Sequence, residues 1–130
     1  MLEDRLNILT APETRLDYPG SVWRCIPTNG ILDSQGKLVM GAGLAKSFAD
    51  LYPTLPSYFG SEVKEKGNHV HCLPALRLFS FPTKHHWKEK SDIDLIIQSC
   101  HELVACYPAL KPYLSVTYLP RPGTGMGGLD

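Results

Sequence analysis

Residues 39–53, VMGAGLAKSFADLYP, run from a glycine-rich loop straight into a helical pattern. Glycine lets backbone N–H groups approach an anion closely, and a helix N-terminus supplies free N–H groups with a partial positive charge. The stretch therefore predicts a helix whose first turn lies beside a phosphate-sized loop. The helix is expected to begin near Leu44 and to stop at Pro53, because apolar residues recur at helical spacing at Leu44, Ala45, Phe48, Ala49 and Tyr52.

Strand-like and helix-like segments alternate on both sides of this stretch, which predicts an α/β layered sheet. Short strands are expected over residues 22–27, 70–73, 76–81 and 115–119, and residues 6–10 are a further candidate. A second helix is expected over residues 57–66, closed by Gly67 as its C-terminal cap. Between the strands at 70–73 and 76–81, Pro74 and Ala75 make a tight connection.

The clearest helix pattern covers residues 92–106. Ser91 is the expected N-cap, with Asp94 three residues on, and the acidic first turn complements the helix dipole. The expected buried stripe consists of Ile93, Ile96, Ile97, Cys100, Leu103 and Val104.

The chain has 130 residues, the size of one domain, and 13 basic residues balance 13 acidic ones. A balanced charge gives no global basic field for nucleic acid, although a local patch can still bind it. No apolar run approaches the roughly 20 residues that a membrane span needs. The first residues, MLEDRLNIL, lack the basic and apolar regions of a secretory signal.

The four cysteines form no CxxC pair, so we expect free thiols in a reducing cytoplasm rather than a disulfide framework. Zinc is the sharper alternative, because His69, His71 and Cys72 lie close together in sequence. The two histidines alternate with Val70 on an expected strand, however, and this favours ordinary strand residues with one solvated face.

A second glycine-rich loop, residues 123–128 (GTGMGG), follows the last expected strand. Two such loops at strand ends can cradle a diphosphate between them. Either loop alone is a weak signal, because most glycine loops are simply turns. The first loop matches neither GxxxxGK[ST] nor the full GxGxxG fingerprint, which disfavours a P-loop nucleotide hydrolase and a hydride-transfer enzyme.

The remaining signal is a cluster of reactive side chains where a strand is expected to end. Residues 81–91 read FPTKHHWKEKS, and residues 119–130 read LPRPGTGMGGLD. Together with Thr28-Asn29-Gly30 and residues 39–53, these segments in this order resemble the macrodomain family. The branch they resemble contains the DarG-type DNA ADP-ribosyl glycohydrolase antitoxins and the terminal ADP-ribose protein glycohydrolases. The resemblance extends from Ile26 to the C-terminus.

The resemblance implies a three-layer α/β/α fold with a mixed sheet and an ADP-ribose pocket at the C-terminal ends of the strands. Lys84 matches the catalytic lysine of this branch, and Asn29 matches the asparagine that contacts the distal ribose. No metal or other cofactor is implied. The ligand-binding residues that the resemblance implies are Thr28, Asn29, Gly30, Met40, Gly41, Ala42, Gly43, Leu44, Phe81, Pro82, Thr83, Pro122, Gly123, Thr124, Gly125, Met126 and Gly127.

The implied chemistry takes place at the anomeric carbon of the distal ribose, through an oxocarbenium-like state that a neutral lysine amine can capture. Positive charge from Lys46, Lys88 or a protonated His86, together with burial, would favour the neutral amine of Lys84. Without the resemblance, Lys84 reads as a phosphate-contacting or solvated residue. Trp87 reads as a packing residue or loop anchor rather than a platform for stacking a base. Lys88 and Lys90 can meet a nucleic-acid backbone, but solvated charge explains them equally well.

The sequence also departs from the branch. Gly127 stands in the loop region where the protein-glutamate hydrolases carry an acid, and Asp130 lies beyond it, which favours action on DNA. The Gly-Asp pair expected after the first strand is missing, so the adenine contact is unassigned, with Asp17 as a substitute. Residues 1–20 are atypical and the domain is shortened at its C-terminus. We therefore expect a minimal domain, or a sheet completed by the N-terminal segment or a partner, including a second copy in a homodimer.

These observations lead to one domain over residues 1–130 that binds ADP-ribose and hydrolyses it from a nucleic-acid base, in the cytoplasm. Three alternatives stay open at this point. They are an ADP-ribose-1″-phosphate phosphatase, a non-catalytic ADP-ribose reader, and a degenerate structural relative.

Overall fold

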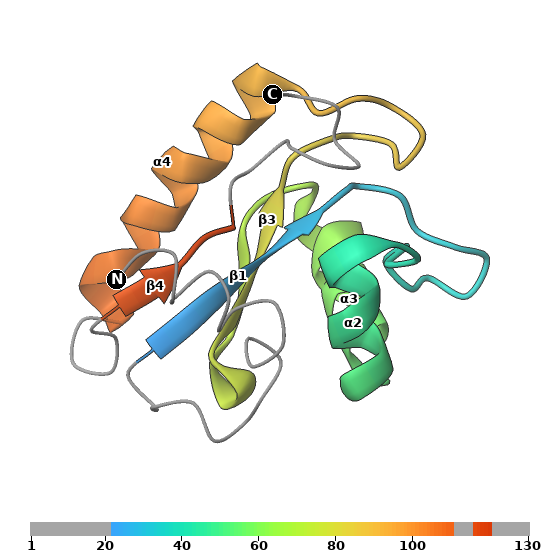
Figure 1. The fold of residues 1–130 in the computed structure, drawn as a ribbon, viewed down its shortest axis with the longest axis horizontal. Helices are drawn as coiled ribbons and strands as arrows, with labels where there is room; N and C mark the ends of the chain where they lie inside the picture. Colours follow the sequence, from blue (N-terminus) through green and yellow to red (C-terminus); the bar gives the residue numbers. More distant parts are fainter. Residues whose placement is uncertain (1–21, 111–115, 121–130) are drawn as a thin grey trace.

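The computed structural model of the protein describes residues 22–110 and 116–120, which form a four-stranded mixed sheet with helices on both faces (Figure 1). In the sheet order β2-β3-β1-β4, β1 runs parallel to both β3 and β4, whereas β2 runs antiparallel to β3. The strands are β1 (Val22–Thr28), β2 (His71–Leu73), β3 (Leu78–Pro82) and β4 (Val116–Tyr118). The predicted layered α/β architecture with a mixed sheet is confirmed.

Helices α2 (Gly43–Leu51) and α3 (Leu55–Lys66) cover one face of the sheet, and α4 (Ile93–Leu110) covers the other (Figure 1). Alternate residues of β1 enter the two cores, because successive strand side chains point to opposite faces. Ile26 joins Phe48 and Phe59 under α2 and α3, while Trp23 and Cys25 lie against α4. A central strand that is buried on both faces explains why all of residues 22–26 except Arg24 are apolar.

Arg24 is a charged exception within this strand, with only 1% of its surface exposed. Its guanidinium carbon lies 5.7 Å from the centroid of the Phe48 ring, and one of its terminal nitrogens lies 3.5 Å from the Leu76 carbonyl oxygen. The aromatic face and the carbonyl group partly replace the water that this cation gives up on burial.

Most predicted elements are confirmed with small changes at their ends. Helix α2 begins at Gly43, one residue before the predicted start, and α3 begins at Leu55 rather than at residue 57, with a proline in its first turn. Gly67 ends α3 with a φ of +96°. The tight connection between β2 and β3 is the 3-10 turn η2 (Pro74–Leu76), followed by Arg77 in the left-handed region. The strand expected over residues 6–10 lies outside the described residues.

The predicted cap of α4 is wrong. Asp92, not Ser91, caps the helix, because its Oδ1 accepts the backbone N–H of Asp94 at 2.9 Å. The backbone N–H of Asp92 is itself bound to the Thr83 carbonyl oxygen at 2.9 Å, which fixes Asp92 at the helix entrance. The Ser91 hydroxyl is instead buried, and no hydrogen-bond partner is found for it within the described part of the chain.

The predicted buried stripe of α4 is also partly wrong. The helix buries Leu95, Ile96 and Ser99, whereas Ile93 is 58% exposed and Val104 is 71% exposed. The rotation follows from a polar contact, because the fully buried Ser99 hydroxyl donates to the last carbonyl of β3, that of Pro82, at 2.7 Å. The helix also extends past the predicted end at Cys106, since both Cys106 and Leu110 pack on the core under α4.

Among the described strands, β2 has only one strand neighbour, and side chains from two helices contact its other side. The Tyr58 hydroxyl of α3 donates to the Cys72 carbonyl oxygen at 2.6 Å. The Glu102 carboxylate of α4 accepts the backbone N–H of Val70, just before the strand, at 3.0 Å. These two bonds fasten β2 to a helix on each face of the sheet.

Candidate functional site

Three predicted segments meet at one edge of the sheet, where the parallel strands β1 and β3 end. Thr28 closes β1 and pairs with Pro82 at the end of β3. The backbone N–H of Thr83 continues this pairing to the Thr28 carbonyl oxygen at 2.9 Å. Because open α/β sheets bind ligands beyond the carboxyl ends of their strands, this edge is the expected place for a site.

Asn29 joins the end of β1 to the loop that precedes α2. Its side-chain Nδ2 donates to the Val39 carbonyl oxygen at 3.0 Å, and its Oδ1 accepts the backbone N–H of Ile31 at 2.9 Å. The residue is 8% exposed. Both ends of its amide therefore hold the loop in place, a structural role that the sequence alone did not indicate. Its predicted contact with the distal ribose stays a prediction.

The predicted first phosphate loop leads directly into α2. Met40 is buried and anchors the loop, whereas Gly41, Ala42 and Gly43 are exposed. The N-cap position is Ala42, in an extended conformation, and its side chain makes no capping hydrogen bond. Leu44 follows in the first turn and is half-buried. Among the residues that the structure describes, no capping side chain from the N-cap position takes up the first-turn N–H groups of α2, so these groups can bind another acceptor.

Packing does not explain why glycine occupies two positions in this loop. A Cβ atom built on Gly41 or on Gly43 would meet no other atom within 4 Å. Gly43 has a φ of +58°, which favours glycine on backbone grounds. Gly41 has no such requirement, and open space around its Cα would let an anion approach the backbone closely. This combination fits the predicted phosphate contact.

The loop that carries Lys84 is fastened at both ends. Its first residue, Thr83, binds Thr28 through its N–H and accepts the N–H of Asp92 on its carbonyl oxygen at 2.9 Å. One residue past Lys84, the His85 carbonyl oxygen accepts the backbone N–H of Gly30 at 3.1 Å. The neighbouring Phe81, which the resemblance implied as a ligand contact, is wholly buried. Lys84 therefore lies on a short loop whose backbone is bound to the end of β1.

Lys84 itself is half-buried, and its ammonium nitrogen lies 3.5 Å from the Trp87 carbonyl oxygen. Two of the cations expected near it have other partners. Lys46 pairs with Asp50 one turn along α2 at 2.7 Å, and Lys88 lies over the Trp87 ring at 5.0 Å from its centroid.

Asn68 is a residue of this region that the sequence did not reveal. It follows Gly67 between α3 and β2, and its Nδ2 donates to the Lys84 carbonyl oxygen at 3.3 Å. It also lies against Gly30, where an added Cβ would come within 2.8 Å of its side chain. Asn68 thus lies between the end of β1 and the loop of Lys84. A single asparagine in the connection between α3 and β2 carries no motif that could have identified it.

Beyond Lys84 the loop forms a turn that exposes an aromatic side chain. The backbone N–H of Glu89 donates to the His86 carbonyl oxygen at 3.0 Å, and Trp87 and Lys88 occupy the middle of this turn. Trp87 is 47% exposed and belongs to neither core. Trp87 is therefore not a core packing residue, because the turn holds the indole on the outside, and its alternative role as a loop anchor stays a prediction.

A histidine and an acid join the base of this loop to α4. His85 Nε2 lies 3.0 Å from Asp92 Oδ2. The hydrogen bond from His85 is the largest of several contacts that hold the pKa of Asp92 below its usual value. Asp92 therefore serves two structures at once, as the N-cap of α4 and as the partner of His85.

The predicted second phosphate loop begins beyond the last described residues. β4 runs parallel to β1, and Leu119 and Pro120 follow it. The chain accordingly leaves β4 at the carboxyl ends of the parallel strands. The predicted contacts at Pro122, Gly123, Thr124, Gly125, Met126 and Gly127, and the substitute adenine contact at Asp17, lie outside the described residues.

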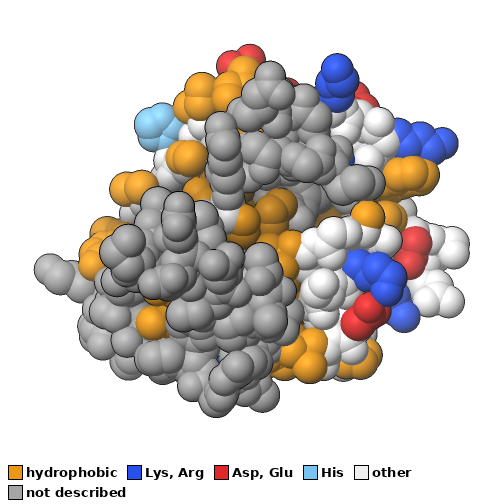
Figure 2. Space-filling model, viewed as in Figure 1, with side chains coloured by type: hydrophobic (Ala, Val, Ile, Leu, Met, Phe, Trp, Pro, Cys, Tyr) orange, Lys and Arg blue, Asp and Glu red, His pale blue; other side chains and the backbone are white. Residues whose placement is uncertain are grey.

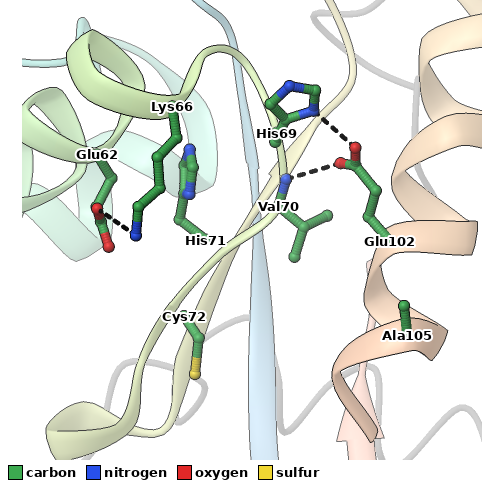
Figure 3. Close-up of a pocket in the computed structure, with 8 residues that line it drawn as sticks. All are labelled: Glu62, Lys66, His69, Val70, His71, Cys72, Glu102 and Ala105. Atoms are coloured by element: carbon green, nitrogen blue, oxygen red, sulfur yellow. Dashed lines mark hydrogen bonds and ion pairs between the residues drawn. The ribbon is translucent and has the colours of Figure 1, made fainter.

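A cavity of about 570 Å³ lies between α3, β2 and α4 (Figure 3). Lys66 and Glu62 pair at 3.2 Å on its α3 side, and His69 and Glu102 pair at 2.6 Å on its α4 side. The described residues that line it include none of the predicted site residues. They are Glu62, Lys66, His69, Val70, His71, Cys72, Glu102 and Ala105.

The groups of this cavity are bound to one another. Burial alone would raise the pKa of Glu102, but bonds from the Val70 N–H, His69 and Gln98 lower it overall. His71 turns its Nε2 to the Gly67 carbonyl oxygen at 2.9 Å. Burial raises the pKa of the Cys72 thiol to about 11, which disfavours a reactive thiolate.

The histidines and the cysteine of the zinc alternative do not converge. His69 bonds to the Glu102 carboxylate, whereas the ring of His71 bonds to the backbone of Gly67. Over residues 22–110 and 116–120, no three His, Cys, Asp or Glu side chains are placed to share a metal ion. The four cysteines are free thiols.

Charged side chains of both signs are mixed on the coloured part of the surface in Figure 2, where lysines and arginines lie beside aspartates and glutamates. This view agrees with the balanced composition of the chain. Within the described parts of the chain, no helix has the length and the apolar character to cross a membrane.

Comparison with known proteins gives matches among solved structures. The chain is similar to the macrodomain of Mycobacterium tuberculosis DarG, at 24% identity and a TM-score of 0.70, covering 88% of this chain and 76% of that one. The macrodomain of Thermus aquaticus DarG gives 26% identity, a TM-score of 0.66 and the same coverage. Thermosipho africanus DarTG in complex with ADP-ribose gives 25% identity and a TM-score of 0.63 over 84% of this chain and 31% of that one.

Comparison by sequence alone gives no match. No family model matches the sequence, and no curated protein matches it. This chain spans less than a third of the Thermosipho DarTG chain, so the two share one part only.

Proposed function

Given that the chain has the macrodomain fold found in DarG, we propose that it binds ADP-ribose at the edge where β1 and β3 end. The observation that carries this proposal is the uncapped start of α2, which opens beside Gly41 and Gly43. A diphosphate would accept hydrogen bonds from the first-turn N–H groups of α2, as other anions do at helix N-termini. A solved DarTG structure with the same fold is described in complex with ADP-ribose, which supports this ligand.

The remaining proposed contacts with ADP-ribose are those that the resemblance to macrodomains implies. The distal ribose would lie between Asn29 and the loop of Lys84, since the Gly30 N–H and the His85 carbonyl oxygen join these segments. The loop of residues 123–127 would enclose the diphosphate from the end of β4. Asn29 would contact the ribose from a position already fixed by Val39 and Ile31.

We further propose that the protein hydrolyses ADP-ribose from a base of a nucleic acid, with Lys84 as its catalytic residue. The amine lone pair of Lys84 would form a bond to the anomeric carbon as the glycosidic bond breaks. The bonding electron pair would leave with the base, which takes up a proton. Water would then add to the anomeric carbon, releasing ADP-ribose and restoring the amine. The fastened backbone on both sides of Lys84 supports this role, because catalysis needs a positioned nucleophile.

Calorimetric titration with ADP-ribose, and with AMP as a control, tests the pocket. We expect micromolar binding of ADP-ribose that AMP does not match. Gly41→Val should abolish this binding, because its branched side chain would occupy the open space above the loop. Absence of binding at millimolar ADP-ribose would overturn the proposed function.

Turnover tests the catalytic part separately. Lys84→Ala should keep its affinity for ADP-ribose and lose release of ADP-ribose from a modified oligonucleotide. Lys64→Ala, which removes an exposed lysine from α3, is the matched control and should keep both. Binding without release from modified DNA, modified protein or ADP-ribose-1″-phosphate would indicate a reader. Release from the 1″-phosphate alone would indicate the phosphatase.

A further inference from the structure

We propose that Trp87 and Lys88 form the leaving-group side of the site, where the indole stacks on a nucleobase of the substrate and the ammonium meets its phosphate. The inference rests on the proposed function and adds to it the residues that would select a nucleic acid over a modified protein. It starts from an exposed aromatic side chain that the fold does not use, since Trp87 lies in neither core.

The loop backbone holds this indole in its exposed position. The turn closed by the Glu89 N–H and the His86 carbonyl oxygen carries Trp87 and Lys88 in its middle. A second bond, from the Lys88 N–H to His86 Nδ1 at 3.1 Å, tightens the turn. The His86 ring lies 5.3 Å from the Trp87 ring at an interplanar angle of 33°. Fixing an aromatic ring before the ligand arrives lowers the entropic cost of stacking on it.

The backbone that carries the indole is also close to the proposed reacting centre. The Lys84 ammonium nitrogen lies 3.5 Å from the carbonyl oxygen of Trp87 itself. When Lys84 reaches the anomeric carbon, the group that leaves that carbon must therefore lie within a side chain's length of the Trp87 backbone. A nucleobase has a flat π-face that an indole can stack upon, whatever its sequence. A modified glutamate or serine side chain lacks such an aromatic face.

The charge of the loop that carries Lys84 also favours a nucleic acid as the substrate. Residues 84–90 contain three lysines and one glutamate, within a chain whose total charge is zero. The Lys88 ammonium lies over the exposed indole, 5.0 Å from the ring centroid. An exposed cation–π contact is weaker than the stacking of a base, so a base can displace it. The released ammonium would then be free to neutralise a backbone phosphate, which adds affinity at low salt.

Binding to a short single-stranded oligonucleotide with one ADP-ribosylated base tests the inference without turnover, in a Lys84→Ala background. We expect the modified oligonucleotide to bind more tightly than free ADP-ribose, and Trp87→Ala to reduce this extra affinity about 10- to 100-fold. The affinity for free ADP-ribose should stay within about twofold, and Trp87→Phe should keep most of the extra affinity. Tyr107→Ala removes another exposed aromatic, from α4, and should change neither affinity.

Tryptophan fluorescence gives a second readout. The two tryptophans differ in exposure, because Trp23 is 3% exposed and Trp87 is 47% exposed. The modified oligonucleotide should quench the Trp87 component, and Trp87→Phe should abolish this quenching while the Trp23 emission stays.

Two outcomes separate the proposals. If the wild-type chain does not bind ADP-ribose, the proposed function and this inference fail together. If it binds ADP-ribose but the oligonucleotide adds no affinity, or if Trp87→Ala weakens both ligands equally, the inference alone is overturned.

Discussion

Replacing Gly30 with alanine should destabilise the protein through one neighbour, Asn68. The new Cβ would lie 2.8 Å from both Cγ and Nδ2 of Asn68 and 3.0 Å from its Cβ, closer than real Cβ contacts, so the asparagine side chain must shift. This movement strains the 3.3 Å bond from Asn68 to the Lys84 carbonyl oxygen. Gly30 has no positive φ, so the alanine backbone itself is unstrained.

Two opposing effects determine how far Gly30→Ala changes the free energy of unfolding. Overpacking of this kind costs about 1–3 kcal/mol. Replacing glycine also lowers the conformational entropy of the unfolded chain, which raises the free energy of unfolding by about 0.5 kcal/mol. We therefore expect Gly30→Ala to lower the free energy of unfolding by about 1–2 kcal/mol. Asn68→Ala should lower it by about 1 kcal/mol, the usual worth of one hydrogen bond.

Urea unfolding of the double variant tests whether the two residues act through each other. In Gly30→Ala with Asn68→Ala, the Cγ and Nδ2 clashes are gone and only the 3.0 Å approach between two Cβ atoms remains. The double variant should therefore be more stable than the sum of the single effects predicts, by about 1 kcal/mol, twice the usual limit of additivity.

Gly41→Ala is the matched control for a glycine substitution. Its Cβ would meet no atom within 4 Å, so its free energy of unfolding should change by less than about 0.5 kcal/mol. Strict additivity of Gly30→Ala and Asn68→Ala would refute the contact between the two residues. An equal destabilisation by Gly41→Ala would refute the steric explanation.

Three further predictions concern the hydrophobic core, the change of stability at acid pH and the reactivity of the thiols. Phe48→Ala should lower the free energy of unfolding by about 3–5 kcal/mol, because the ring is fully buried; a loss below about 1 kcal/mol in urea unfolding would contradict its place in the core. Glu102 has a lowered folded pKa, so its stabilisation is present above about pH 4.5 and is lost as the pH falls; the stability difference between wild type and Glu102→Gln should shrink from about pH 7 to about pH 3, and a constant difference would refute this reading. Cys100 is exposed whereas Cys25 is buried with a raised pKa, so Cys100 should react first with a thiol reagent near pH 8; equal rates by mass spectrometry would show that the core opens freely.

Much of the architecture could be predicted because its signals are local. The helix of α2 and the loop before it follow from glycine chemistry and from apolar spacing within residues 39–53. The strands β1 and β3 follow from short apolar runs that end at turn residues. The parallel pairing of these strands then brings Thr28 and Pro82 to one edge, which places the two predicted loops together.

The missed features depend on contacts between distant segments. The rotation of α4 is set by Ser99, whose hydroxyl donates to the carbonyl oxygen of Pro82, 17 residues earlier in the chain. The helical spacing of apolar residues predicts that the isoleucines are buried and does not predict the burial of a serine. Asp92 rather than Ser91 became the cap because Thr83 holds its N–H. The role of Asn68 arises only when Gly30 and Lys84 are brought beside it by the sheet.

The two bonds that fasten β2 also affect how copies of the protein meet in concentrated solution. A strand with unpaired N–H and C=O groups is a template for strands of other molecules, which leads to aggregation. The Tyr58 hydroxyl already donates to the Cys72 carbonyl oxygen of β2, and the Glu102 carboxylate already accepts the N–H of Val70, just before the strand. An incoming strand would first have to break both bonds and then lie against the negative charge of Glu102. This side of the sheet therefore resists growth by strand addition.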